Sequence, residues 1–188
     1  METTMLTLRR ELEDLLAQYE RAWPEEREMI SRFREFAASG EPLQGKVNPK
    51  RHVTGSAWIV NSARDKVLLT HHAKLRKWLQ LGGHTDEGEA WAATALREAY
   101  EESGLPGLTL ARAGLYDIDI HEIPARPDTP AHDHYDLRFL IVTDDTVPLV
   151  ISEESQDLAW VPIDRLGEYT DEESQLRMAR KMSSGAPA

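Results

Sequence analysis

The sequence contains no cysteine, has few basic residues for its acidic ones and lacks a long apolar run. Because none of the 188 residues carries a thiol, disulfides, thiolate zinc sites, iron–sulfur clusters and cysteine nucleophiles are excluded. The chain has 22 Lys and Arg against 33 Asp and Glu, a formal net charge of −11. This charge disfavours bulk binding of nucleic acid, which depends on basic side chains that neutralise phosphates. A chain of this charge that handles phosphates needs another positive charge, and divalent cations are the obvious candidates.

The absence of long apolar segments indicates where in the cell the protein is expected to be. No segment reaches the roughly 18 apolar residues of a membrane-spanning helix, and charges interrupt the N-terminal stretch where a signal peptide would be apolar. We therefore expect a soluble, cytoplasmic protein with no membrane association. Hydrophobic residues make up 40% and charged residues 29% of the chain, proportions typical of a globular domain.

The first 40 residues have a helical pattern. Apolar residues recur at helical spacing from Leu8 to Phe36, with Pro24 between two stripes and Gly40 at the end. We predict an N-terminal helical extension over residues 1–40, a two-helix hairpin that either covers one face of the main domain or contributes to a homodimer contact. Residues 41–50 contain two prolines and a glycine and are typical of a linker.

The main domain is predicted over residues 50–182. Runs of β-branched and aromatic residues predict strands over 52–60, 66–72, 110–120, 134–143 and 157–163. Helical patterns cover about 89–103 and 171–182. This order favours an α/β (α+β) fold with a mixed sheet and helices on its faces. Residues 183–188 are expected to form a disordered tail.

Three acidic residues share one side of the helix predicted over 89–103. Glu98, Glu101 and Glu102 stand at i, i+3 and i+4, so their carboxylates repel one another by about 0.2–0.5 kcal/mol per pair. A solvated acidic face tolerates that repulsion, but shared divalent cations explain the cluster more economically. Helical spacing places Trp91 and Thr94 on the same side as the acids. The residues predicted on the opposite, core-facing side are Ala92, Leu96, Ala99 and Tyr100.

The segment around these acids resembles the Nudix box, G-x5-E-x7-R-E-U-x-E-E-x-G-U, in which U is aliphatic. The matching positions, found without a gap, are Gly83, Glu89, Arg97, Glu98, Ala99, Glu101, Glu102, Gly104 and Leu105. Ala99 is small for its aliphatic position. The resemblance implies a Nudix-like α/β/α sandwich with a mixed β-sheet. It also implies a Mg²⁺- or Mn²⁺-dependent pyrophosphohydrolase that acts on a nucleoside diphosphate linked to another moiety, such as a nucleoside triphosphate or a nucleotide sugar.

The resemblance also implies roles for the matched residues. Metal ligands would come from Glu98, Glu101, Glu102 and the Gly83 carbonyl. Arg97 would orient a glutamate through a charge-assisted hydrogen bond, and Glu89 would brace the loop against the helix. Gly104 would end the helix.

The general base is left open between box and loop glutamates. Glu102 is our first choice and Glu98 the next, because Nudix relatives use either a box glutamate or one in a later loop. Glu154 offers such a loop carboxylate ahead of the strand at 157–163, although it is equally well explained as an ordinary loop acid.

Substrate contacts are indicated more weakly. His84 follows the proposed Gly83 ligand directly, and Lys77, Asp119, His121 and Arg138 are further candidates for contacts with the substrate. The family's substrate-specific markers are mostly absent. A proline that marks one of its substrate groups would lie nearer the box than Pro124, the first proline well beyond it. The substrate therefore stays open. An alternative is a Nudix-fold module that senses a nucleotide without cleaving it, although such relatives typically lose box glutamates.

Histidines are numerous. The chain has seven, among them His71, His72, His84, His121, His132 and His134. Nothing in the sequence shows these side chains to converge, and cations that bind phosphate prefer oxygen ligands. We therefore expect the metal to be held by carboxylates.

Overall fold

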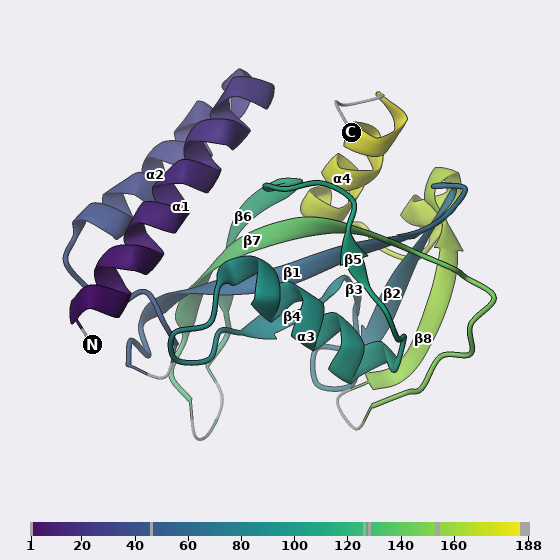
Figure 1. Cartoon of the computed structure of the whole chain (residues 1–188). Coiled ribbons are helices and arrows are strands. Elements are labelled where there is room, and N and C mark those ends of the chain that lie inside the picture. The colour runs from purple at the N-terminus through teal and green to yellow at the C-terminus, as the bar shows by residue number, and fades with distance from the viewer. Residues whose placement is uncertain (1, 46, 126, 128, 153–154, 185–188) are drawn as a thin grey trace.

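The N-terminal segment forms two helices that lie side by side (Figure 1). The computed structural model describes residues 2–45, 47–125, 127, 129–152 and 155–184. Helix α1 (Glu2–Ala22) is followed by a short 3-10 helix, η1 (Pro24–Glu26), and by α2 (Arg27–Ala38). Pro24 is the first residue of η1, a position at which the helix does not use a backbone N–H donor. Arg34 of α2 reaches Glu13 and Glu20 of α1 at 2.9 and 2.8 Å, which ties the two helices together.

In the described part of the chain, eight strands form a mixed sheet at the centre of the molecule; the mixed sheet is as predicted, although the sequence indicated only five strand segments. The strands are β1 (Arg51–Asn61), β2 (Lys66–His72), β3 (Trp78–Leu79), β4 (Leu81–His84), β5 (Thr109–Leu110), β6 (Asp117–Ile123), β7 (His132–Thr143) and β8 (Ser155–Pro162). The main path runs β3-β2-β1-β7-β5, with β4 on β1, β6 on β7 and β8 on β2. The β1–β7 pair is parallel, and the other described pairs are antiparallel.

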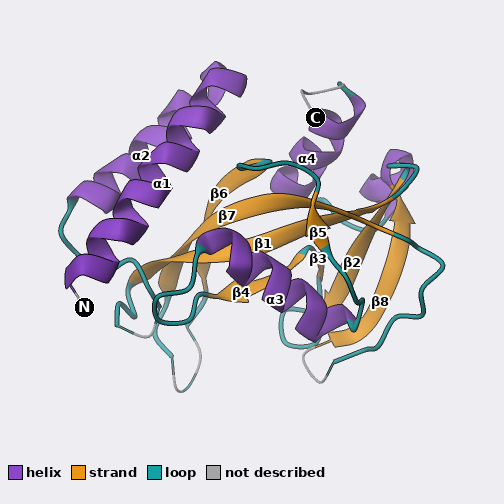
Figure 2. Cartoon of the chain, in the orientation of Figure 1, coloured by secondary structure: helices purple, strands orange, loops and turns teal. Residues whose placement is uncertain are grey.

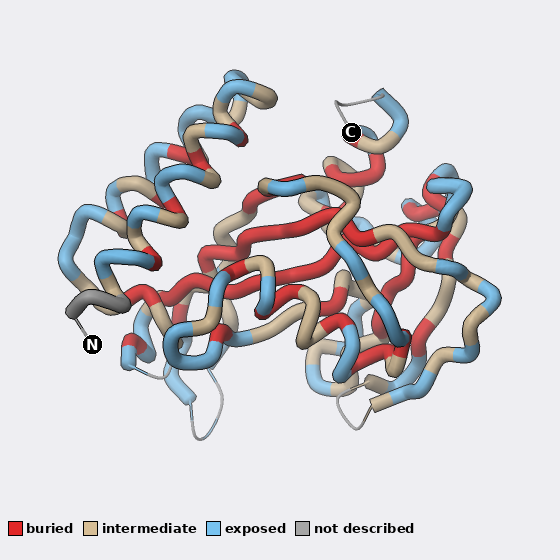
Figure 3. The backbone as a smooth tube through the Cα atoms, in the orientation of Figure 1, coloured by how far each residue is buried: buried red, intermediate tan, exposed pale blue. Residues whose placement is uncertain are grey.

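Strands β1 and β7 are the most enclosed part of the fold. Their parallel register extends from Arg51 opposite Asp133 to Asn61 opposite Thr143. The backbone of both strands is buried over most of its length (Figure 3). A strand buried on both faces is apolar in consecutive positions, which explains the run Ala57–Val60 in β1.

Helices cover both faces of the sheet (Figure 2). Val53, Ala57 and Ile59 of β1 pack in the same clusters as residues of α3 (Trp91–Ser103). The alternate residues Trp58 and Val60 pack with α4 (Glu173–Ser183) and a 3-10 helix, η2 (Ile163–Glu168). Because successive side chains of a strand point to opposite faces, α3 and α4 lie on opposite sides. The α/β/α sandwich is thereby confirmed.

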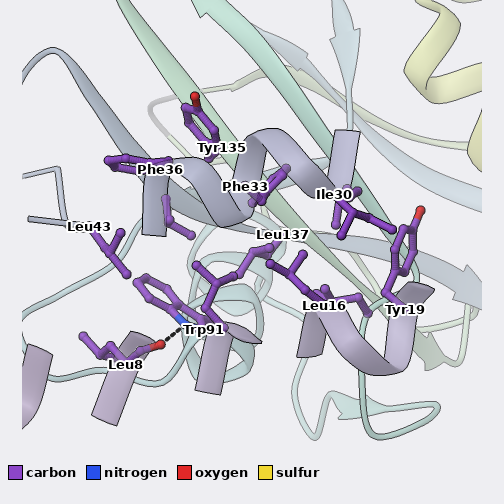
Figure 4. Close-up of a cluster of buried hydrophobic side chains, with 14 of the residues drawn as sticks. Leu8, Leu16, Tyr19, Ile30, Phe33, Phe36, Leu43, Trp91, Tyr135 and Leu137 are labelled. Atoms are coloured by element: carbon purple, nitrogen blue, oxygen red, sulfur yellow. Dashed lines mark hydrogen bonds between the residues drawn. The ribbon is translucent and has the colours of Figure 1, made fainter. Parts of the chain in front are cut away.

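The N-terminal helices share a core with the α3 face of the sheet (Figure 4). The Phe33 ring meets Tyr135 of β7 edge-on, with ring centroids 5.2 Å apart, and Phe36 contacts the same tyrosine at 4.7 Å. Trp91 of α3 donates from its indole nitrogen to the Leu8 carbonyl of α1 at 3.4 Å. The hairpin therefore covers one face of the main domain, and the homodimer contact stays a prediction.

Two element boundaries differ from the sequence prediction. The strand predicted over 110–120 is divided into β5 and β6, because the chain turns between them at Gly114, whose φ is 112°. Helix α4 continues through Ser183, one residue into the predicted tail, and residues 185–188 lie outside the described part. In the ranges that the structure describes, every helix is too short or too polar to cross a bilayer.

The Phe33 contact predicts how strongly the hairpin stabilises the fold. Phe33 is fully buried against Tyr135, so Phe33→Ala should lower the free energy of unfolding by about 3–5 kcal/mol, as measured by urea denaturation. Leu6→Ala is the matched control, since Leu6 lies on α1 with 64% of its surface exposed. A loss below 1 kcal/mol for Phe33→Ala would show that the hairpin is not part of the core.

Candidate active site

Helix α3 lies unusually close to strand β1. A Cβ atom at Gly55 of β1 would stand 2.9 Å from the Trp91 carbonyl oxygen and 2.9 Å from the Thr94 Cβ. Gly55 therefore allows the backbones to approach, as glycine does where two elements pack closely. At its far end α3 stops at Gly104, which adopts the left-handed conformation (φ 69°) and donates to the Tyr100 carbonyl at 2.8 Å.

This packing buries more of α3 than the predicted side, on which Ala99 is buried and Ala92 and Leu96 pack against the core as expected. Tyr100, expected in the core, is 58% exposed, whereas Trp91 and Thr94 are fully buried. Glu102 is also buried, with 9% of its surface exposed. Glu98 and Glu102 thus face β4, whereas Glu101 points toward solvent, and the close approach at Gly55 holds this side of the helix against the sheet.

Arg97 connects the helix to the loop before it. Its Nε and Nη2 atoms donate to the two carboxylate oxygens of Glu89, each at 3.0 Å, and Nη2 also donates to the His84 carbonyl at 2.9 Å. Its Nη1 lies 2.8 Å from Glu98 and 3.1 Å from Glu101. Hydrogen bonds from Arg97 hold the pKa of Glu89 below its ordinary value. Glu89 also accepts from the Asp86 backbone N–H and the Thr94 hydroxyl, so it fastens the loop to α3.

Glu98 and Glu102 face the backbone of β4. A Cβ atom at Gly83 would lie 2.6 Å from the Glu98 carboxylate, so the bare backbone of Gly83 and that carboxylate adjoin. Glu102 accepts a hydrogen bond from the Gly82 N–H at 3.2 Å. Glu101 lies further out, with 54% of its side chain exposed. A carbonyl and carboxylates grouped in this way are the oxygen donors that Mg²⁺ and Mn²⁺ prefer.

A large cleft opens beside these residues. Its volume is about 980 Å³, and its lining includes Gly83, Glu98, Lys77, Asp119 and His121. The cleft is large enough for a nucleotide-sized ligand. His84 is exposed at the same wall. The structure therefore brings all five predicted substrate contacts, His84, Lys77, Asp119, His121 and Arg138, to one cleft, and Lys77 is ion-paired there with Glu172.

Arg138, the fifth predicted contact, also borders the cleft, but its guanidinium group is engaged below the surface. Its side chain is 2% exposed and lies 3.1 Å from Asp117, 3.3 Å from Asp119 and 2.8 Å from Asp136. Arg138 therefore holds these aspartates in place, and its role as a substrate contact stays a prediction. Glu154, the loop candidate for the base, lies outside the described residues.

An ionic network that the sequence did not predict surrounds Asp117. Lys181 Nζ lies 2.6 Å from Asp117 and 2.6 Å from Glu26, and Arg177 lies 2.8 Å from Asp117. Burial alone would raise the pKa of Asp117, but the hydrogen bond from Arg177 and the charges of Arg138 and Lys181 hold it below its ordinary value. A signal was present in the run Asp117–Ile120, where acids alternate with isoleucines and so occupy one face of a strand.

Comparisons with known proteins agree with this geometry. A family model described as NUDIX domain matches residues 50–182. The chain belongs to the NUDIX domain family. As the family and its relatives indicate, this Nudix chain is a hydrolase.

Individual relatives extend the comparison. A Lactococcus lactis protein described as "Probable DHNTP pyrophosphohydrolase" is 27% identical over 154 residues, 80% of this chain and 86% of the relative. A NUDIX-family hydrolase from Clostridium perfringens is 28% identical, with a TM-score of 0.55, and the match covers 72% of this chain and 98% of that one. The MutT protein from Methanosarcina mazei shares the fold, with a TM-score of 0.58 at 17% identity over 74% of this chain and 97% of its own.

The Arg97–Glu89 contact predicts a pH-dependent loss of stability. Arg97→Met should raise the pKa of Glu89 toward 4.5 and cost about 1.5–3 kcal/mol at pH 7, the scale of hydrogen bonds to a charged group. A depressed carboxylate pKa stabilises the fold above pH 4.5, and this contribution disappears as the pH falls through the folded-state pKa. Urea unfolding at pH 7 and at pH 3.5 should therefore show a smaller difference between variant and wild type at the lower pH. Arg32→Met, at an exposed position of α2, is the control, and an equal difference at both pH values would contradict this assignment.

Proposed function

We propose that this chain is a metal-dependent pyrophosphohydrolase that cleaves a phosphoanhydride bond of a nucleoside diphosphate linked to another moiety, such as a nucleoside triphosphate or a nucleotide sugar. The observation that carries the proposal is that Glu98 adjoins the Gly83 backbone at the wall of the cleft, and that Glu102 on the same helix is bonded to the neighbouring Gly82 N–H. Nudix membership supports the reaction class, and the Lactococcus relative supports a triphosphate as one substrate.

Mg²⁺ or Mn²⁺ would be held by Glu98, Glu101, Glu102 and the Gly83 carbonyl. These residues fit a hard divalent ion, because all their donor atoms are oxygens and the Gly83 backbone adjoins the Glu98 carboxylate without an intervening side chain. When bound, such an ion neutralises phosphate charge and increases the acidity of a coordinated water. The −11 charge of the chain makes that neutralisation necessary for a polyanionic substrate to enter.

The side chains around this group orient the reactants. Glu102 is assigned as the general base that takes the proton of the attacking water, with Glu98 as the next candidate. The Gly82 N–H holds one oxygen of Glu102 and so fixes the direction of its carboxylate. Arg97 keeps Glu98 and the loop carbonyl of His84 in one arrangement. His84, Lys77, Asp119 and His121 are positioned along the cleft for contacts with the rest of the substrate.

Replacing the assigned base tests its role. Glu102→Gln should keep the fold and lower kcat by two or more orders of magnitude, the effect of losing an acid–base group. Steady-state kinetics with Mg²⁺ measures the change, and circular dichroism checks the fold. Glu87→Gln, at an exposed position of the same loop, is the matched control and should retain activity. Unchanged turnover in Glu102→Gln would remove Glu102 from the mechanism.

A substrate panel tests the reaction itself. The panel contains nucleoside triphosphates, nucleotide sugars, ADP-ribose, capped RNA and dihydroneopterin triphosphate. Each is incubated with Mg²⁺ and analysed by ion-exchange chromatography for the cleavage products, a monophosphate together with pyrophosphate or with a phosphorylated partner. We expect turnover of at least one member by the wild type and little by Glu102→Gln. Binding of a panel member by calorimetry without any product would instead identify a nucleotide-sensing module.

A further inference from the structure

Four histidines from distant parts of the chain converge at one end of the cleft. The parallel register of β1 and β7 places His52 opposite His134, and His132 lies two residues earlier on the same face of β7. Strand β4 contributes His84, next to Thr54 of β1. One ring nitrogen from each of these four histidines lies within 4.8 Å of the others. We propose that His52, His84, His132 and His134 form a binding site for a transition-metal ion of the Zn²⁺ class, separate from the carboxylate site on α3.

The distances are close to those of a coordination shell. Nitrogen ligands of tetrahedral zinc lie about 2.0–2.1 Å from the ion, which places them about 3.3 Å from one another. The Nε2 atoms of His132 and His134 are already 3.1 Å apart. The remaining nitrogens reach a shared ion through small side-chain movements, since the cluster spans 4.8 Å.

Backbone carbonyls set the ring tautomers that a metal needs. His52 Nδ1 lies 3.0 Å from the Asn48 carbonyl, and His132 Nδ1 lies 2.9 Å from the Pro130 carbonyl. A carbonyl accepts only, so both Nδ1 atoms carry hydrogen and both Nε2 atoms present lone pairs to the cluster. A metal-bound histidine ordinarily has this arrangement, in which its second nitrogen donates to a carbonyl or carboxylate.

His52 provides independent support from its burial. The residue is 3% exposed, and its Nε2 atom is buried with no hydrogen-bond partner among the described residues. An unpaired buried polar atom is costly, and coordination would satisfy it. The loop before β1 closes over the ring, because a Cβ atom at Gly45 would lie 2.9 Å from His52 Cδ2 and 2.8 Å from His84 Cδ2.

The preferred ions also separate the two sites. Imidazole ligands favour Zn²⁺, Cu²⁺, Ni²⁺ and Co²⁺ over Mg²⁺, whereas the oxygen donors on α3 have the opposite preference. The two sites therefore select different ions, and the histidine site does not depend on the proposed hydrolytic function.

Metal uptake by the full chain tests the site. Wild-type protein dialysed against Zn²⁺ in the presence of millimolar Mg²⁺ should retain about one zinc per chain by elemental analysis. With Co²⁺ in place of Zn²⁺, the visible spectrum should show the intense bands of tetrahedral coordination. The double variant His132→Asn with His134→Asn should bind Zn²⁺ at least 100-fold more weakly by calorimetry. His71→Asn, which removes a histidine on β2 outside the cluster, should bind as the wild type does.

Two further variants separate this site from the carboxylate site and from misfolding. Glu98→Gln with Glu102→Gln should keep its zinc, since no carboxylate belongs to the histidine set. His84→Asn changes an exposed side chain, so it should preserve the circular dichroism spectrum and still weaken Zn²⁺ binding at least 10-fold. The proposal is overturned if wild type takes up no zinc, or if folded His84→Asn and the double histidine variant both bind it as tightly as wild type.

Discussion

Eleven residues of β1 run parallel to eleven of β7, and the location of the site follows from this pairing. Parallel neighbours cannot be joined by a tight turn, so the long chain between them contains α3, β4 and β6, three of the elements that border the cleft. The odd-numbered residues of β1 from Val53 to Ile59 face the helices on one side. The even-numbered residues from His52 to Ser56 face the cleft on the other. A shift of register by one residue would exchange these two sets.

The local part of the site could be predicted from sequence because its geometry is local. The spacing of Glu98, Glu101 and Glu102 is sufficient to group them on one side of a helix, and Gly104 marks the end of that helix wherever it packs. The rotation of α3 about its own axis cannot be predicted from the local sequence. It depends on Gly55 of strand β1, whose missing side chain leaves room for Trp91 and Thr94. For that reason, Tyr100 was placed wrongly while the carboxylates were grouped correctly.

Features that depend on strand register could not be predicted from the sequence. Thr54 and Asp136 are 82 residues apart, yet the Thr54 hydroxyl donates to the Asp136 carboxylate at 2.9 Å. The same pairing brings His52 beside His134, and the local sequence around either residue does not predict this contact. The sequence also shows no ion-pair partners for Arg138, a candidate for contact with the substrate. Its three aspartates come from β6 and β7, and their convergence needs the folded sheet.

The network around Asp117 connects the beginning and the end of the described chain. Tyr19 and Glu26 reach it from the N-terminal helices, and Arg177 and Lys181 reach it from α4. Asp117 shares Arg138 with Asp119, which stands at the cleft wall. During synthesis, a chain that has emerged from the ribosome only as far as β8 still lacks both cations of α4. The cleft wall is thus among the last parts to gain its native charge balance, although the helix with the box glutamates was made some 70 residues earlier.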